Sequence, residues 1–70
     1  KLSLDFESKR EYIKIALFDG LGSEVKVIYN GMISAGNHTL DVDIQNLPAG
    51  NYFVRIASDS AQNTKLLVKY

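Results

Sequence analysis

The sequence contains no cysteine, which excludes a disulfide framework, a thiol nucleophile and a thiolate metal site. Eight basic residues balance eight acidic ones, and no run of like charge is longer than the Lys9-Arg10 pair. A basic surface for nucleic acid or for an anionic membrane is therefore not expected. No stretch approaches the roughly 20 apolar residues that a membrane-spanning helix needs. These absences leave a charge-balanced domain that folds without covalent cross-links.

The length of 70 residues allows one hydrophobic core. A chain this short buries only roughly 60% of its unfolded surface, so the core is expected to be shallow. The apolar residues are mostly Leu, Ile, Val, Tyr and Phe, types that favour strands over helices. We predict a single domain over residues 1–70. Because the sequence opens at Lys1 rather than Met, we expect it to be cut from a longer polypeptide.

Apolar and polar residues alternate with a period of two along most of the sequence. This pattern predicts strands over residues 2–7, 12–19, 24–29, 32–33, 38–44, 52–57 and 64–70. Glycine, asparagine and proline clusters predict the turns between them, including one at Asn30-Gly31 and a break at residues 47–50. About seven short strands at roughly ten-residue spacing predict an all-β fold, a small antiparallel Ig-like β-sandwich.

The phase of the alternation predicts which side chains are buried. The segment 12–19 is apolar at nearly every position, so we expect a central strand covered on both faces. Asp41 and Asp43 share the opposite phase from their apolar neighbours and should face water. The predicted core residues are Ile15, Leu17, Val25, Val27, Leu40, Val42, Tyr52, Val54, Ile56, Leu66 and Val68.

No group of residues predicts catalysis or metal binding. His38 has no second His or Cys to share a metal and no nucleophile nearby in sequence, so a structural or solvent-exposed role is expected. Asp41 and Asp43 could contact a hard cation, but calcium takes six to eight oxygens, and a solvated strand face is the favoured interpretation. Gly20 and Gly22 precede a strand rather than a helix, which removes the physical basis of a phosphate-binding loop. We expect no enzyme activity, cofactor or metal.

The aromatic side chains leave one binding function open. Tyr12, Tyr29, Tyr52, Phe53 and Tyr70 could form a platform for sugars, as in a carbohydrate-binding or adhesion module. In a domain this small most aromatic rings are needed for the core. An Ig-like spacer of an extracellular enzyme is a further alternative.

Three stretches, taken in order, resemble the type A C-terminal sorting domain of the type IX secretion system of Bacteroidetes-type bacteria. The first is IKIALFDGLGSEV at residues 13–25, which is similar to that family's strand, glycine turn and Glu-Val strand start. The second is AGNHTLDVDIQNLPAGNYFVRI at residues 35–56, with a Leu-x-x-Gly-x-Tyr corner. The third is TKLLVKY at residues 64–70, similar to the lysine-bearing strand with which these proteins end. Members usually begin with a segment such as Pro-Asn-Pro, which would lie before Lys1.

The resemblance implies an export address carried by a cargo protein. Such a domain passes the periplasm and the outer membrane, is typically removed by a sortase-like protease, and leaves its cargo on the cell surface or outside the cell. The implied partners are the type IX secretion machinery and its sortase-like protease. Neither nucleic acid nor a small-molecule substrate is implied. A sorting domain should end its parent chain, whereas a spacer should have sequence beyond Tyr70.

The resemblance also implies which residues are recognised during export. Asp59-Ser60-Ala61 looks like the O-glycosylation motif of these bacteria, with Ser60 as the candidate acceptor. Lys65→Ala and Lys69→Ala are expected to be mild surface substitutions. The candidate recognition residues are Gly22, Gly36, Leu47, Gly50, Tyr52, Lys65 and Lys69.

Overall fold

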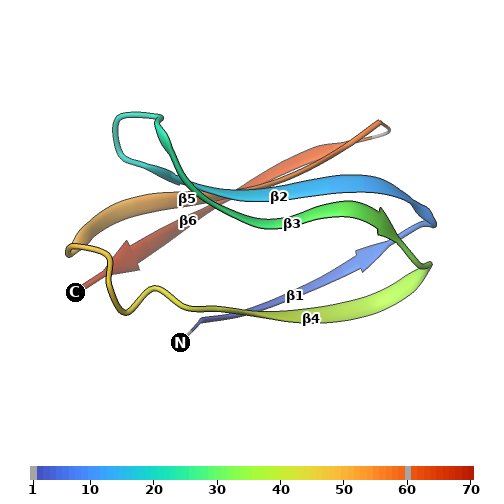
Figure 1. Ribbon diagram of the computed structural model, residues 1–70, viewed down its shortest axis with the longest axis horizontal. Coiled ribbons are helices and arrows are strands. Elements are labelled where there is room, and N and C mark those ends of the chain that lie inside the picture. Colours follow the sequence, from blue (N-terminus) through green and yellow to red (C-terminus); the bar gives the residue numbers. More distant parts are fainter. Residues whose placement is uncertain (1, 60) are drawn as a thin grey trace.

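The alternating segments form strands in the computed structural model, which describes residues 2–59 and 61–70 (Figure 1). No helix forms in this part of the chain, and hence none that is long and apolar enough to cross a membrane. The predicted all-β class is confirmed. The six strands of the described residues are β1 (Leu2–Ser8), β2 (Glu11–Asp19), β3 (Glu24–Ile33), β4 (Gly36–Val42), β5 (Gly50–Ser58) and β6 (Gln62–Lys69).

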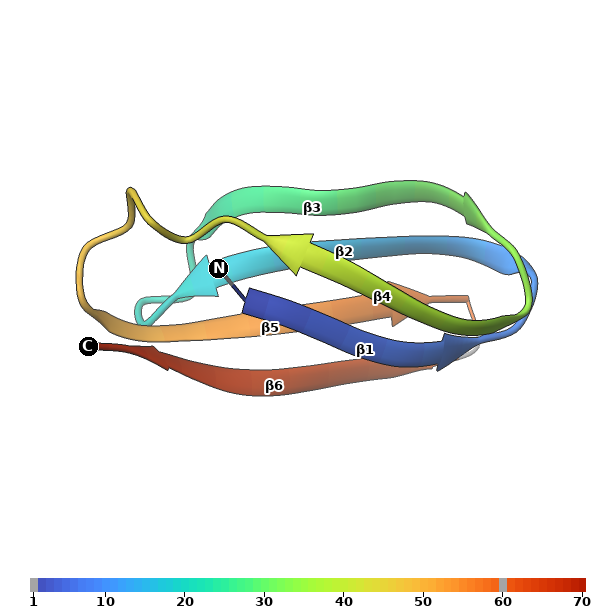
Figure 2. The ribbon, with the colours of Figure 1, turned by 90° about the horizontal axis from the view of Figure 1, so that it is seen from below.

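The strands form two antiparallel sheets that pack face to face, as the sandwich prediction requires (Figures 1 and 2). One sheet has four strands in the order β3-β2-β5-β6, and the other pairs β1 with β4. Two short connections, residues 9–10 and residues 34–35, carry the chain from one sheet to the other. Gly36 follows the second of them with a φ of 122°, a conformation that side chains with a Cβ rarely adopt.

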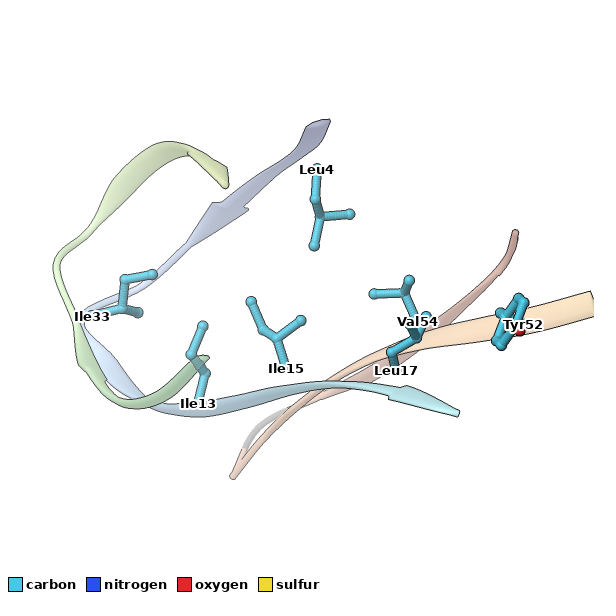
Figure 3. Close-up of a cluster of buried hydrophobic side chains, with 7 residues drawn as sticks. All are labelled: Leu4, Ile13, Ile15, Leu17, Ile33, Tyr52 and Val54. Carbon is cyan, nitrogen blue, oxygen red and sulfur yellow. The ribbon is translucent and has the colours of Figure 1, made fainter. Parts of the chain in front are cut away.

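The core lies between the two sheets and is built mainly by β2 (Figure 3). Ile13, Ile15 and Leu17 point from one face of β2 and are fully or almost fully buried. Leu4 of β1 covers them from the other sheet (Figure 3). The predictions for Ile15, Leu17, Val42, Tyr52 and Val54 are confirmed, while Leu40 and Ile56 are half-buried.

The strand count differs from the prediction because Asn30-Gly31 does not turn the chain. β3 runs through this pair without interruption, with Asn30 opposite Lys14 and Gly31 opposite Ile13 of β2. Pairing along the full length of β2 therefore overrides the local turn signal. The predicted short strand 32–33 is the end of β3, which leaves six strands rather than about seven.

The predicted burial of Val25 and Val27 is wrong, because their side chains are 40% and 44% exposed. The pairing of β3 with β2 is irregular: Ile15 lies opposite Tyr29, whereas the next residue, Ala16, lies opposite Val27. A second such shift occurs between Glu24, which lies opposite Phe18, and Lys26, which lies opposite Leu17. Each β-bulge adds one residue to β3 and reverses the phase of the alternation, which no pattern in the sequence announced.

The predicted burial of Leu66 and Val68 is also wrong, because they are 63% and 39% exposed. β6 contains three consecutive apolar residues, so its alternation is compatible with either phase. Pairing with β5 decides between them by placing Leu67 opposite the buried Tyr52. Leu67 therefore faces the core, and its two neighbours lie on the outer face.

No second layer of the described residues covers the outer face of β2, so the expectation of cover on both faces is wrong. Tyr12 is 50% exposed, and the exposed Lys14 pairs with Glu24 of β3 at 3.0 Å. Phe18, further along the same face, lies under the guanidinium of Arg55 at 4.8 Å from the ring centre. β2 is thus central within its sheet, as predicted, but only one of its faces contacts the other sheet.

Candidate recognition surface at the sheet corner

Lys69 joins the last strand to the loop between β4 and β5. Its ammonium group donates hydrogen bonds to the backbone carbonyls of Ile44 at 2.7 Å, Gln45 at 3.0 Å and Leu47 at 2.5 Å. An ammonium group has three donors, and each of them meets a separate acceptor here. The loop thus closes around the lysine, and the expectation that Lys69 is an ordinary surface residue is wrong.

Tyr52 holds the other end of the same loop. Its ring is 6% exposed within the core, and its hydroxyl donates to the carbonyl of Pro48 four residues earlier at 2.5 Å. Gly50 lies between them with a φ of 153°, at the margin of the region that residues with a Cβ avoid. The strand β5 therefore begins at a corner that is fixed from both sides, by Tyr52 and by Lys69.

The turn between β2 and β3 is held by the carboxylate of Asp19. One of its oxygens accepts hydrogen bonds from the backbone N–H groups of Leu21 and Ser23, both at 2.9 Å. Gly22 has a φ of 89° and donates to the carbonyl of Asp19 at 3.0 Å. Asp19 is opposite Tyr52 in the pairing of β2 with β5, which places this turn beside the corner.

These pieces gather at one end of the molecule, which we call the corner end: the turn 19–23, the loop 43–49 with Gly50 and Tyr52, and Lys69-Tyr70 (Figures 1 and 2). Two large apolar side chains are almost wholly exposed there, Leu21 at 94% and Tyr70 at 101%. The fold supports the backbone of the corner end and leaves these side chains open to solvent.

The structure brings together five of the seven predicted recognition residues. Gly36 lies at the opposite end, where the chain crosses between the sheets (Figure 2). Lys65 lies along β6, opposite Val54, and is exposed. Ser60 lies outside the described residues. The five at the corner end are Gly22, Leu47, Gly50, Tyr52 and Lys69.

Sequence reasoning missed the groups that hold this end together. Asp19 ends the predicted strand 12–19 and is not predicted to order the turn that follows, although Asp followed by Gly-x-Gly is a recognisable signal for such a role. The exposed Leu21 was also overlooked. The carbonyls that bind Lys69 could not be inferred, since backbone groups carry no sequence signature.

The remaining polar candidates have structural contacts. His38 stacks on Phe6 with ring centres 5.5 Å apart, and its Nε2 lies 2.7 Å from the carbonyl oxygen of Ser34. Asp41 accepts a hydrogen bond from Ser3 at 3.0 Å, and Asp43 accepts one from the backbone N–H of Gln45 at 3.0 Å. Both carboxylates face water as predicted. Within residues 2–59 and 61–70, no three His, Cys, Asp or Glu side chains are grouped as they would be to hold a metal ion.

Comparison with known protein families shows to which family this chain belongs. Residues 1–70, the whole sequence, match the model of the secretion system C-terminal sorting domain. The chain belongs to this sorting-domain family. The resemblance found in the sequence is thus confirmed, and with it a role as a C-terminal sorting signal of type IX secretion. Searches of curated proteins and of solved structures gave no significant match.

Family membership relates the sorting domain to the type IX secretion system and to export to the cell surface or beyond. The corner residues 47–52 belong to the second stretch on which the resemblance was based, and Lys69 belongs to the third. The corner end is therefore built partly from these stretches, which also extend along the rest of the sandwich.

Proposed function

We propose that this sorting domain is a non-catalytic export address that directs a cargo protein through the type IX secretion system. The single observation that carries the proposal is the family match over residues 1–70. The polar side chains of the corner end support it, because Asp19, Tyr52 and Lys69 are engaged in shaping backbone rather than grouped around a substrate pocket.

The corner end is the surface that the secretion machinery recognises in this proposal. A recognition surface must keep one shape in every cargo, and three sets of hydrogen bonds hold the backbone here. It must also expose side chains whose burial against a partner lowers the free energy. Leu21 and Tyr70 do so, since both are almost completely exposed and apolar.

A passenger experiment tests the address function. Residues 1–70, preceded by a Pro-Asn-Pro-type segment such as members of the family usually carry, are fused behind a periplasmic fluorescent passenger, with its own signal peptide, in a type IX-competent bacterium. We expect the passenger on the cell surface or in the medium, and only in the periplasm of a strain whose type IX translocon is deleted. A known sorting domain on the same passenger is the positive control. Retention of the present fusion in the periplasm beside a working control would contradict the address function and favour an Ig-like spacer.

The role of the corner end is tested by substitutions that leave the fold intact. In the same assay we expect Leu21→Ser combined with Tyr70→Ser to reduce export, because both side chains project into solvent. Leu66→Ser is the matched control, an exposed apolar residue on the outer face of β6. Equal export of the unsubstituted domain, the double variant and the control, with equal melting temperatures, would show that the recognition surface lies elsewhere on the domain.

Later steps of the route follow the family pattern in this proposal. The domain crosses the periplasm before it reaches the outer membrane, and a sortase-like protease then removes it from the cargo. The exported passenger should therefore be lighter than the full fusion protein by about the mass of the domain, 7.8 kDa. Exported passenger that still carries the domain in a strain with active protease would contradict the cleavage step alone.

A further inference from the structure

The two long sides of the sandwich differ in how they are closed. On the β3–β4 side, residues 34–35 connect the sheets directly, and the ammonium of Lys26 donates to the carbonyl of Asp43 at 3.1 Å. On the β1–β6 side the small sheet ends at β1, which has β4 as its only partner strand in the described chain. Figure 2 shows β1 and β6 along this margin.

A cavity of about 290 Å³ opens on the β1–β6 side. Leu4 of β1, Val54 of β5 and Leu67 of β6 supply its apolar lining, and Leu4 and Val54 are otherwise buried core residues. Asp5 and Lys65 also line it. The core can thus be reached from this side, directly beside the unpaired backbone edge of β1.

Among the described residues, the edge of β1 lacks several of the features that prevent strand addition, although it carries the acidic side chains of Asp5 and Glu7. Proteins protect edge strands with lysine, proline, bulges or a covering segment. β6 carries Lys65 and Lys69, β3 contains two bulges in its pairing with β2, and the connection 34–35 and Lys26 lie on the β4 side. β1 contains neither lysine nor proline, and its pairing with β4 is regular from Leu2 to Ser8.

We propose that the free edge of β1 is a strand-addition site for an extended segment of a partner protein, one that alternates apolar with basic side chains. A strand added beside β1 would present alternate side chains to the two faces of the small sheet. Apolar side chains on the inner face would enter the cavity over Val54 and Leu67. The others would lie beside Ser3, Asp5 and Glu7 on the outer face.

The negative charge on the outer face of the small sheet favours basic side chains in the partner strand. Asp5 and Glu7 of β1 and Asp41 of β4 are exposed there, and neither strand contains Lys or Arg. Thr39 donates to Asp5 at 2.7 Å and Ser3 donates to Asp41 at 3.0 Å, so the two carboxylates stay on this face. Opposite charges on neighbouring strands attract, and like charges directly opposite repel.

The same charges argue against a second copy of this chain as the occupant. Antiparallel pairing of two β1 strands about a two-fold axis centred on the strand would place Asp5 opposite Asp5 of the other copy. Glu7 would then lie diagonally from it. A partner strand with lysine or arginine at these positions meets no such repulsion. This site is separate from the corner end, and the proposal does not depend on the export function.

Three blocked seven-residue peptides test the proposal by NMR titration of the isotope-labelled chain. TVKVKVT alternates apolar and basic residues, TVEVEVT replaces the lysines with glutamate, and TVKPKVT places a central proline that cannot donate to a strand ladder. We expect TVKVKVT to shift the backbone amides of β1 and the methyl groups of Val54 and Leu67 in a saturable way. TVEVEVT should bind at least about five-fold more weakly, and TVKPKVT should not bind measurably.

A charge reversal provides the matched protein variant. Asp5→Lys should weaken the binding of TVKVKVT and strengthen the binding of TVEVEVT. Glu24→Lys, at the exposed start of β3 in the other sheet, should leave the binding of both peptides unchanged. Melting curves of the variants confirm that they are folded. The proposal is overturned if the peptides bind equally, if the shifts fall on β3 or β6 without β1, if nothing binds, or if the chain dimerises through β1.

Discussion

The ammonium of Lys69 donates a 2.5 Å hydrogen bond to the backbone carbonyl of Leu47, 22 residues earlier in the chain. The contact joins the last strand of the four-stranded sheet to the loop that follows the small sheet. A lysine typical of the family's final strand therefore has a structural role here. Loss of export in a Lys69 variant would by itself say nothing about recognition.

Replacement of Lys69 by Met should lower the free energy of unfolding by about 1.5–3 kcal/mol. Methionine keeps an apolar stem of similar length but removes all three donors, and hydrogen bonds to charged groups contribute about this much. Urea unfolding followed by circular dichroism measures the difference. Lys65→Met is the control on the same strand, with an expected change within about 0.5 kcal/mol. Equal stabilities of the two variants would show that the loop does not depend on Lys69.

Removal of the Tyr52 hydroxyl should loosen the corner while the core stays packed. Tyr52→Phe loses the hydrogen bond to Pro48, with an expected cost of about 0.5–1.5 kcal/mol. Tyr12→Phe loses a hydroxyl contact to Asn30 on the exposed face and should cost less. Thermal melts of both variants provide the comparison. A larger loss for Tyr12→Phe would contradict the structural role assigned to the corner.

Truncation of Ile15 should be far more damaging than truncation of Leu66, although the sequence pattern predicts both to be buried. Ile15 is fully buried, and Ile15→Ala should cost about 2–5 kcal/mol, enough to unfold so small a domain. Leu66 is 63% exposed, and Leu66→Ala should change the stability by about 0.5 kcal/mol or less. If Leu66→Ala also unfolds the domain, the phase of β6 in the structure is wrong.

Two glycines of one turn should respond differently to alanine. Gly22 has a φ of 89°, which an L-residue adopts at a cost of about 1–2 kcal/mol. Gly20 has no positive φ, and a Cβ there would lie 3.6 Å from the carbonyl oxygen of Asn51, an ordinary contact distance. Urea midpoints should therefore fall clearly for Gly22→Ala and little for Gly20→Ala. The reverse order would mean that space, not backbone conformation, limits this turn.

The fold class and about half of the core follow from the amino-acid sequence alone. Alternation of apolar and polar residues has the period of a strand, so Ile13, Ile15 and Leu17 could be assigned to one face of β2 without coordinates. The ordered motifs also revealed the family, because turns and corners require glycine, proline and tyrosine at particular spacings. Alternation and turn motifs involve residues close together in the sequence, so they can be recognised without knowledge of the tertiary structure.

The packing of the strands against one another sets which face some strands turn to the core and which groups far apart in the sequence come into contact. Val27 lies on the outer face because a β-bulge between Val27 and Tyr29 shifts β3 against β2. Leu67 rather than Leu66 faces the core because β5 sets the register of β6. Lys69 donates to the carbonyl of Leu47 because the packing of the two sheets places the end of β6 beside the loop between β4 and β5. Register and backbone acceptors depend on the partner strand, and a period-two pattern of one strand contains no information about either.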